Sequence, residues 1–211
     1  MARTAPTDLE RDGWERGLRH IAGVDEAGCG PVAGPVVAAA VVLPPFRRAP
    51  TRLKGVNDSK KLTPENRERL AAVIREHSVS CAVAAASPRE IERLNIRRAT
   101  ALAMRRAVDR LSVRPDHLLV DGLPVPELGE HEAIVGGDMR CISIACASIL
   151  AKVVRDDLMA RLDRRYPEYG WASNKGYPTG PHLEAIRAYG PTAHHRTTWA
   201  PILQHELRLE A

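Results

Sequence analysis

Residues 24–31 read Val-Asp-Glu-Ala-Gly-Cys-Gly-Pro, so two adjacent carboxylates end an apolar run and lead directly into a glycine turn. Side chains alternate between the two faces of a strand, so Asp25 and Glu26 reach one site only if the turn begins at Glu26. Repulsion between the two acids must be offset by positive charge. A bound divalent cation is the simplest source of that charge, and the motif therefore indicates a metal-dependent enzyme.

The next segment, residues 34–43, is a continuous apolar run rich in Val and Ala, which is typical of a strand covered on both faces. Two helix starts are marked by a capping hydroxyl followed by proline, at Thr63-Pro64 and at Ser87-Pro88. From these patterns we expect strands at residues 20–25, 34–43, 79–86, 117–120 and 132–135, and helices at residues 63–76, 87–111, 143–165 and 181–189.

This order, rich in strands first and helical last, predicts an α/β fold with a mixed central sheet flanked by helices. A helical C-terminal lobe is expected from about residue 166. The 211 residues are enough for one compact domain, expected over residues 18–211. Residues 1–17 are polar and are expected to form a loosely ordered N-terminal segment.

The composition narrows the class of protein. Hydrophobic residues make up 44% of the chain, which excludes a disordered protein, and 31 Lys and Arg against 26 Asp and Glu suit a polyanionic partner. The four cysteines lack C-x-x-C spacing, which argues against a disulfide framework and favours a reducing compartment, the cytoplasm. The longest apolar run is broken at Gly34-Pro35 and is too short to span a bilayer, so no membrane partner is expected.

Two further aspartates stand at expected strand ends, Asp121 before Gly122 and Asp138 after a pair of glycines. Ligands in open α/β sheets gather at such ends. Oxygen donors without His or Cys companions favour Mg²⁺ or Mn²⁺ over zinc, and two such ions can stabilise both the attacking and the leaving oxygen of a phosphodiester. A single aspartate there is more often a turn residue, so the argument depends on the four acids together.

At this point the chain resembles a known family, the type 2 ribonucleases H, and it looks like bacterial ribonuclease HII. The resemblance spans about residues 20 to 201. Each motif is short, but the ordered set is specific. The motifs are residues 24–31 with Ala-Gly-Pro-Val at 33–36, Asp-Ser-Lys-Lys-Leu at 58–62, Val-Asp-Gly at 120–122, Gly-Asp at 137–138, Ile-Ala-Cys-Ala-Ser-Ile-Leu-Ala-Lys-Val at 144–153, Arg-Asp at 155–156, Lys-Gly-Tyr-Pro-Thr at 175–179 and His-Arg at 195–196.

The resemblance implies a ribonuclease H-like fold and hydrolysis of the RNA strand of RNA–DNA hybrids. It also implies incision on the 5′ side of single ribonucleotides embedded in duplex DNA, leaving 3′-hydroxyl and 5′-phosphate ends. The substrates would be RNA–DNA hybrid and duplex DNA containing ribonucleotides. By the same resemblance, the catalytic and metal-binding carboxylates are Asp25, Glu26, Asp121 and Asp138.

In the family, the turn after the acidic pair is Gly-Arg-Gly. Together with a tyrosine that matches Tyr177, it reads the ribose 2′-hydroxyl. Here the turn is Gly28-Cys29-Gly30. Bare glycine backbone can approach a sugar closely, and the 2′-hydroxyl distinguishes RNA from DNA. We therefore expect recognition of the ribose to be kept and affinity for the adjacent phosphate to be lower, because a thiol cannot pair with phosphate as a guanidinium does.

Five side chains are expected to contact substrate phosphates. Lys60 and Lys61 lie in a polar loop, whereas Ser148, Lys152 and Arg155 are spaced by four and three residues on one expected helix and so share a face. A solvated helix face is the alternative for that stripe. The His195-Arg196 dipeptide also matches the family, and a structural role is as well supported as a catalytic one.

Residues 204–209, Gln-His-Glu-Leu-Arg-Leu, faintly resemble peptides that dock on the bacterial sliding clamp, with an ordinary helix end as the alternative. Trp14, Trp171 and Trp199 are expected to be packing residues. Two other classes stay open. One is a fold relative such as a junction resolvase or transposase core, and the other is a non-enzymatic basic nucleic-acid binder, which would not need four acids. A ribonuclease HIII is disfavoured because residues 1–19 are too few for that group's extra N-terminal domain.

Overall fold

A five-stranded mixed sheet forms the centre of the molecule. The structure is a computed structural model that describes residues 4–46 and 50–199. The strand order is β3-β2-β1-β4-β5, with the first three strands antiparallel and β4 and β5 parallel to β1. The predicted mixed α/β sheet is confirmed. The strands are β1 (Ile21–Ala27), β2 (Val36–Val42), β3 (Ser80–Ala86), β4 (His117–Asp121) and β5 (Glu132–Ile134).

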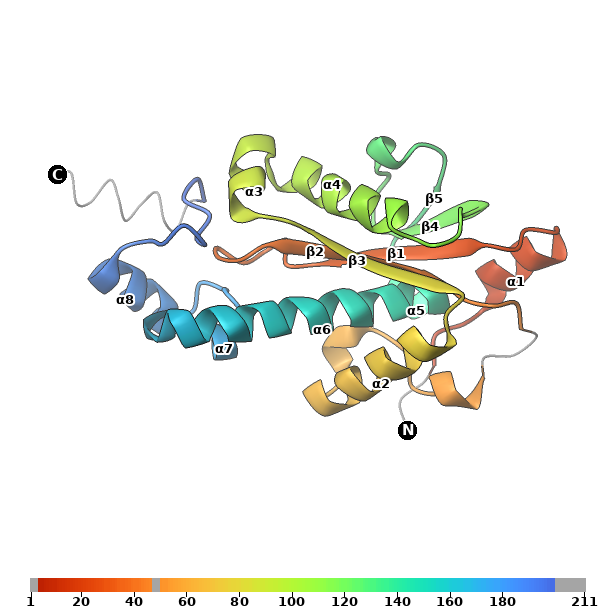
Figure 1. Ribbon diagram of the computed structural model, residues 1–211, viewed down its shortest axis with the longest axis horizontal. Coiled ribbons are helices and arrows are strands. Elements are labelled where there is room, and N and C mark those ends of the chain that lie inside the picture. The colour runs from red at the N-terminus through yellow and green to blue at the C-terminus, as the bar shows by residue number, and fades with distance from the viewer. Residues whose placement is uncertain (1–3, 47–49, 200–211) are drawn as a thin grey trace.

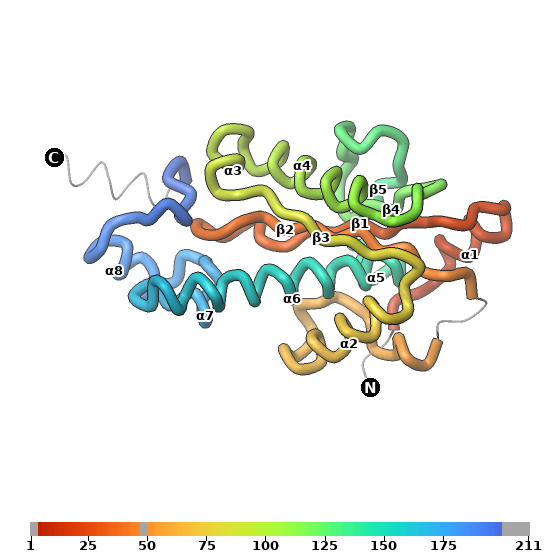
Figure 2. The backbone as a smooth tube through the Cα atoms, viewed as in Figure 1, coloured from red at the N-terminus to blue at the C-terminus, as the bar shows by residue number. Residues whose placement is uncertain are grey.

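Helices cover both faces of this sheet (Figure 1). One face carries α3 (Pro88–Leu94) and α4 (Ile96–Asp109), and the other carries α2 (Pro64–His77) and the long α6 (Ile142–Arg165). Every residue of β2 is buried, because its small and branched side chains meet α4 on one side and α6 on the other. Figure 2 shows α6 following the sheet along most of its length, so α6 is the main support beneath β1 and β2.

The capping residues act as the sequence predicts at both helix starts. The Thr63 hydroxyl accepts a hydrogen bond from the Asn66 N–H, and Ser87 and Glu90 form a reciprocal capping box. The single helix expected over residues 87–111 is wrong, however. It breaks at Asn95, whose φ of +67° ends α3, and whose side chain then accepts from the Arg98 N–H to start α4.

The N-terminal segment differs from the expected loose order. Within it, α1 (Asp8–Glu15) is a helix, and its Glu10 is fully buried. The Glu10 carboxylate accepts the Ser143 N–H at 2.7 Å and the Cys141 thiol at 3.0 Å, at the first turn of α6. An acidic side chain satisfies the unpaired N–H groups of a helix start, so this contact holds α1 in place.

The C-terminal part is a set of short helices and turns at one end of the sheet (Figure 1). Trp171 is buried there and stacks on Tyr169, and Trp199 packs on the same cluster. Near the N-terminus, Trp14 packs edge-on against Phe46. The predicted packing roles of the three tryptophans are therefore confirmed. Within the described ranges, no helix is long and apolar enough to cross a membrane. The remaining elements are α5 (Gly137–Arg140), α7 (Trp171–Asn174), α8 (Gly180–Tyr189) and the 3-10 turns Thr51–Leu53, Ser59–Lys61, Pro126–Leu128 and Pro167–Tyr169.

Candidate active site

The ends of two neighbouring parallel strands bring acidic residues together. Val24 of β1 is in register with Val120 of β4, so the next residues, Asp25 and Asp121, lie side by side at the same edge. The Asp121 carboxylate accepts the Gly137 N–H at 2.6 Å, and this bond ties the end of β4 to the start of α5. Since Asp138 is the next residue of α5, the loop after β5 adds a third acid to the same edge.

The sequence predicted that the turn begins at Glu26, and this prediction is wrong. β1 continues to Ala27, which pairs with Val37 of β2, and the turn begins at Gly28 with a φ of +101°. The pairing partners offered by β2 keep the chain extended for one residue more. Asp25 therefore faces α6, whereas Glu26 extends from the edge towards α4. A turn at Glu26 is not needed to bring the two acids together, because at the end of β1 they still lie close enough for Glu26 to raise the pKa of Asp25.

Different neighbours hold the two acids. The Asp25 carboxylate accepts the Glu26 N–H at 2.6 Å and a hydrogen bond from the Ser148 hydroxyl on α6. The Glu26 carboxylate accepts the Cys29 thiol at 3.4 Å, and that sulfur also lies 3.3 Å from the Thr100 hydroxyl on α4.

The electrostatics of the site show that the acids act on one another. Asp25 is only 5% exposed, and burial, with added repulsion from Glu26 and Asp121, raises its pKa well above the usual value. Burial and the charge of Asp121 likewise raise the pKa of Glu26. For Asp138 the pKa is raised by burial and then by Asp58 and Asp121. Asp121 thus lies within electrostatic reach of the other three expected carboxylates.

This donor set suits a hard cation. All four side chains offer oxygen, and the raised pKa values of Asp25, Glu26 and Asp138 show that their anionic forms are disfavoured here unless positive charge is added. Between residues 4 and 199, leaving out 47–49, no three Asp, Glu, His or Cys side chains already form a closed metal-binding group. Binding an ion would require these carboxylates to turn towards it.

Asp58 is a residue whose part in the site the sequence analysis missed. It precedes the Ser59–Lys61 turn, accepts the Lys60 N–H, and shares a hydrogen bond with Asp138. The sequence contains it in the Asp-Ser-Lys-Lys-Leu motif at residues 58–62, to which the sequence analysis assigned no role for the acid. The structure places that loop beside α5, where Lys60 favours the ionised forms of both Glu26 and Asp138.

The turn and Tyr177 lie next to each other, as a joint role requires. A Cβ on Gly30 would be 3.5 Å from Cε1 of Tyr177, and both residues are exposed. The Cys29 side chain is directed inwards to Glu26 and to the apolar cluster under α4, and burial raises its pKa to about 12. Cys29 is therefore a neutral thiol packed beside a carboxylate.

The helix stripe is only partly where it was expected. Ser148, Lys152 and Arg155 do share a face of α6, but Ser148 and Arg155 are buried on that face. Arg155 is 1% exposed and donates to three backbone carbonyls, so its expected contact with phosphate is wrong. Ser148 bonds to Ser59 at 2.9 Å, and Lys152 is half-buried with its ammonium 2.7 Å from Asp156.

The lysines of the loop are better placed for a polyanion. Lys60 and Lys61 are both exposed, and Lys61 lies 3.6 Å from Asp58. Two exposed ammonium groups beside an acidic site can approach phosphates that the acids alone would repel.

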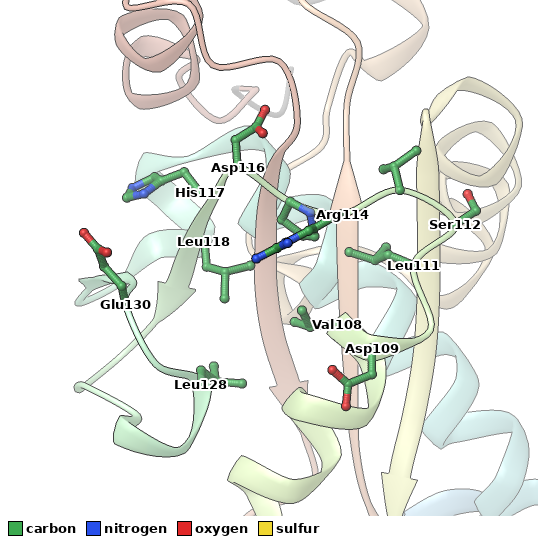
Figure 3. Close-up of a pocket in the computed structure, with 12 residues that line it drawn as sticks. Val108, Asp109, Leu111, Ser112, Arg114, Asp116, His117, Leu118, Leu128 and Glu130 are labelled. Atoms are coloured by element: carbon green, nitrogen blue, oxygen red, sulfur yellow. The ribbon is translucent and has the colours of Figure 1, made fainter.

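A separate cavity of about 550 Å³ lies at the other end of β4 (Figure 3). Its lining includes Asp109, Arg114, Asp116 and Glu130, and it opens where β4 begins, not where it ends at Asp121. The cavity therefore lies away from the acidic edge.

Comparison with known proteins agrees with this geometry. Residues 22–202 match the family model of ribonuclease HII. Ribonuclease HII of Desulfitobacterium hafniense (strain DSM 10664 / DCB-2) is 53% identical over 196 residues, covering 92% of this chain and 74% of the relative. Ribonuclease HII of Geobacter sulfurreducens is 51% identical over 199 residues, covering 94% and 90%.

Solved structures agree as well. The crystal structure of ribonuclease H2 from Pyrococcus horikoshii OT3 superposes with a TM-score of 0.77 at 30% identity, covering 90% of this chain and 99% of that one. Ribonuclease HII from Archaeoglobus fulgidus, solved in complex with PCNA, superposes with a TM-score of 0.72 at 28% identity, covering 85% and 95%.

A mixed sheet with acids gathered at the ends of adjacent strands, and with these structural neighbours, defines a nuclease of the ribonuclease H class. Such enzymes depend on divalent metal and act on RNA–DNA hybrids. Within that class the chain belongs to the ribonuclease HII family, because the family model covers most of its length.

Proposed function

We propose that this enzyme is an endonuclease that cleaves the RNA strand of hybrids and also incises on the 5′ side of single ribonucleotides embedded in duplex DNA. Asp25, Glu26, Asp121 and Asp138 would hold Mg²⁺ or Mn²⁺, and the products would carry 3′-hydroxyl and 5′-phosphate ends. The observation that supports this most strongly is that Asp25 and Asp121 lie side by side at the ends of two parallel strands, with Asp121 bonded to the Gly137 N–H next to Asp138.

The bound ions would activate water and offset the charge that develops on the scissile phosphate. The protein's own residues would position the reactants. Ser148 holds the Asp25 carboxylate through a hydrogen bond, and Cys29 holds that of Glu26. Lys60, exposed and close to Glu26 and Asp138, would pair with a phosphate beside the scissile bond.

Specificity for ribose would come from the turn Gly28-Cys29-Gly30 with Tyr177. Tyr177 is 46% exposed beside Gly30, so its ring can pack on a sugar while the turn's backbone N–H groups meet the 2′-hydroxyl. Because the Cys29 thiol faces inwards, it leaves a phosphate next to this turn without a cationic partner at position 29.

The decisive experiment uses a duplex with one ribonucleotide, incubated with Mg²⁺, Mn²⁺ or EDTA. We expect a single cut on the 5′ side of the ribonucleotide, lost with EDTA and lost in Asp25→Asn. Asp109→Asn, which changes an exposed aspartate by the distant cavity, is the matched control and should cut normally. Cleavage of four-way junctions instead would favour a resolvase, and binding without cleavage would favour a non-enzymatic binder.

Position 29 has its own test. Cys29→Arg should lower KM on the single-ribonucleotide duplex and steepen the salt dependence of binding by about one phosphate contact. A KM that is unchanged or higher would reject a phosphate next to this turn.

We also propose a contact between residues 204–209 and a sliding clamp. These residues lie outside the described part of the chain. The support is the resemblance of the segment to clamp-docking peptides and the PCNA complex of the Archaeoglobus relative. A clamp pull-down should retain the full chain and lose a chain truncated after Pro201; equal retention would reject the contact.

A further inference from the structure

Two buried residues outside the acidic cluster hold the turn and the Tyr177 loop together. His195 and Arg196 are 1% and 0% exposed. The backbone of this pair lies against the segment after the turn: Ala33 forms an isolated β-bridge with His195, and the Arg196 N–H donates to the Val32 carbonyl at 2.8 Å. The pair is thus fixed to the base of the turn before its side chains are considered.

The guanidinium of Arg196 donates hydrogen bonds to backbone carbonyls in and just after the turn. Its Nη1 donates to the Cys29 carbonyl at 2.9 Å, its Nη2 to the Gly28 carbonyl at 2.6 Å and to that of Gly34, and its Nε to Gly34 at 3.1 Å. A planar fork can satisfy several carbonyls at once, which an ammonium cannot do with the same geometry. Burial, with added repulsion from Arg155, lowers the pKa of Arg196 to about 10.

These hydrogen bonds of Arg196 fix the direction in which the turn's N–H groups point. The described residues contain no cis peptide bond, and in a trans peptide the C=O and the following N–H point in opposite directions. With the carbonyls of Gly28 and Cys29 held by Arg196, the N–H groups of Cys29 and Gly30 must point away from it. The two donors proposed to meet the 2′-hydroxyl are therefore oriented by a side chain 167 residues further along the chain.

The ring of His195 is connected through His182 to the loop that carries Tyr177. Its Nδ1 accepts the Thr192 N–H at 2.9 Å, so the proton is assigned to Nε2, which donates to Nε2 of His182 at 3.2 Å. His182 also accepts from Trp171 Nε1 and therefore carries its own proton on Nδ1, which donates to the Tyr177 carbonyl at 2.8 Å. This relay connects His195 to the backbone of Tyr177.

We propose that the buried His195-Arg196 pair is the positioning element for ribose recognition, with Arg196 orienting the turn and His195 holding Tyr177 beside it. This inference rests on the proposed function of the turn and Tyr177. Neither residue touches the substrate in this account; both act through backbone groups that do.

The test measures discrimination between two duplexes that differ only in one 2′-hydroxyl. Dissociation constants are measured in the Asp25→Asn background, so that the ribonucleotide duplex stays intact. We expect Arg196→Lys to reduce the preference for the ribonucleotide duplex by roughly three- to tenfold, the value of one oriented hydrogen bond. Leu70→Ala, which changes a buried residue of α2, is the control for lost stability and should keep the preference.

His195 provides a second, independent arm. His195→Gln keeps a donor near the position of Nε2, whereas His195→Leu removes it, so Gln should retain more of the preference than Leu. If Arg196→Lys and both His195 variants discriminate as well as Leu70→Ala does, the inference is wrong while the proposed function stands. If the protein without these changes shows no preference for the ribonucleotide, the proposed function itself fails.

Discussion

Gly28 and Gly30 occupy the same three-residue turn, and the structure predicts opposite consequences when each becomes alanine. Gly28 has a φ of +101°, which an L-residue adopts only with strain. A Cβ there would overlap Nε of Arg155 and lie 2.6 Å from its Cδ and 2.8 Å from the Pro35 carbonyl. Gly30 is outside the positive-φ region, and its nearest neighbour would be Tyr177 at 3.5 Å, an ordinary contact.

The magnitudes follow from these contacts. For Gly28→Ala, the left-handed backbone costs roughly 1–2 kcal/mol and displacement of the buried Arg155 roughly 1–3 kcal/mol, so unfolding should become easier by about 2–5 kcal/mol. For Gly30→Ala, the free energy of unfolding should change by less than about 0.5 kcal/mol. The added methyl of Gly30→Ala would instead lie on the exposed surface beside Tyr177, where a sugar is proposed to approach.

Urea denaturation and steady-state cleavage of the single-ribonucleotide duplex separate the two effects. We expect Gly28→Ala to lose stability, and Gly30→Ala to keep stability while its KM rises. Equal loss of stability in the two variants would refute the packing argument for Gly28. A Gly30→Ala enzyme with normal KM and normal stability would refute the close approach of substrate to the turn.

Three other predictions can be checked with single variants. Burial lowers the pKa of His195 to about 3, below the roughly 6.5 of an unfolded chain, so the unfolded state binds more protons than the folded state between those pH values. The free energy of unfolding, measured with urea, should therefore fall on acidification by up to about 1.4 kcal/mol per pH unit, and less steeply in His195→Gln. The same dependence of unfolding free energy on pH in both proteins would contradict this. Glu10→Ala leaves the buried Ser143 N–H without its acceptor and should cost about 1–3 kcal/mol in thermal or urea unfolding, against almost nothing for the exposed Glu15→Ala. Lys152→Ala should flatten the slope of log K against log salt by about 0.9, whereas the exposed Lys54→Ala should leave it unchanged; a slope equal to that of the unmodified protein would show that Lys152 serves Asp156 alone.

Local patterns in the sequence predicted most of the fold. The apolar run at 34–43 and the capping residues Thr63 and Ser87 depend on neighbours a few positions away, and β2, α2 and α3 begin or lie where these patterns indicate. The acids Asp25 and Asp121 could also be matched from sequence, since both end predicted strands that prove to be adjacent and parallel.

What failed depends on contacts between distant segments. Helical spacing showed that Ser148 and Arg155 share a face, but only the packing of α6 on the sheet decides that this face is buried. The extension of β1 through Ala27 is set by its pairing with β2. The Glu10 carboxylate accepts the N–H of Ser143, which lies 133 residues further along the chain. No local pattern in a polar N-terminal segment predicts this contact.

The central claim is that the acids at the ends of β1, β4 and β5 together bind divalent cations. Electron paramagnetic resonance of free Mn²⁺, recorded while the protein is titrated, measures this directly without any substrate. We predict that the unmodified protein depletes the free Mn²⁺ signal and that Asp25→Asn and Asp121→Asn largely abolish this binding while Asp109→Asn does not. Mn²⁺ binding that is equally strong in all four proteins, or absent from the unmodified one, would contradict the claim.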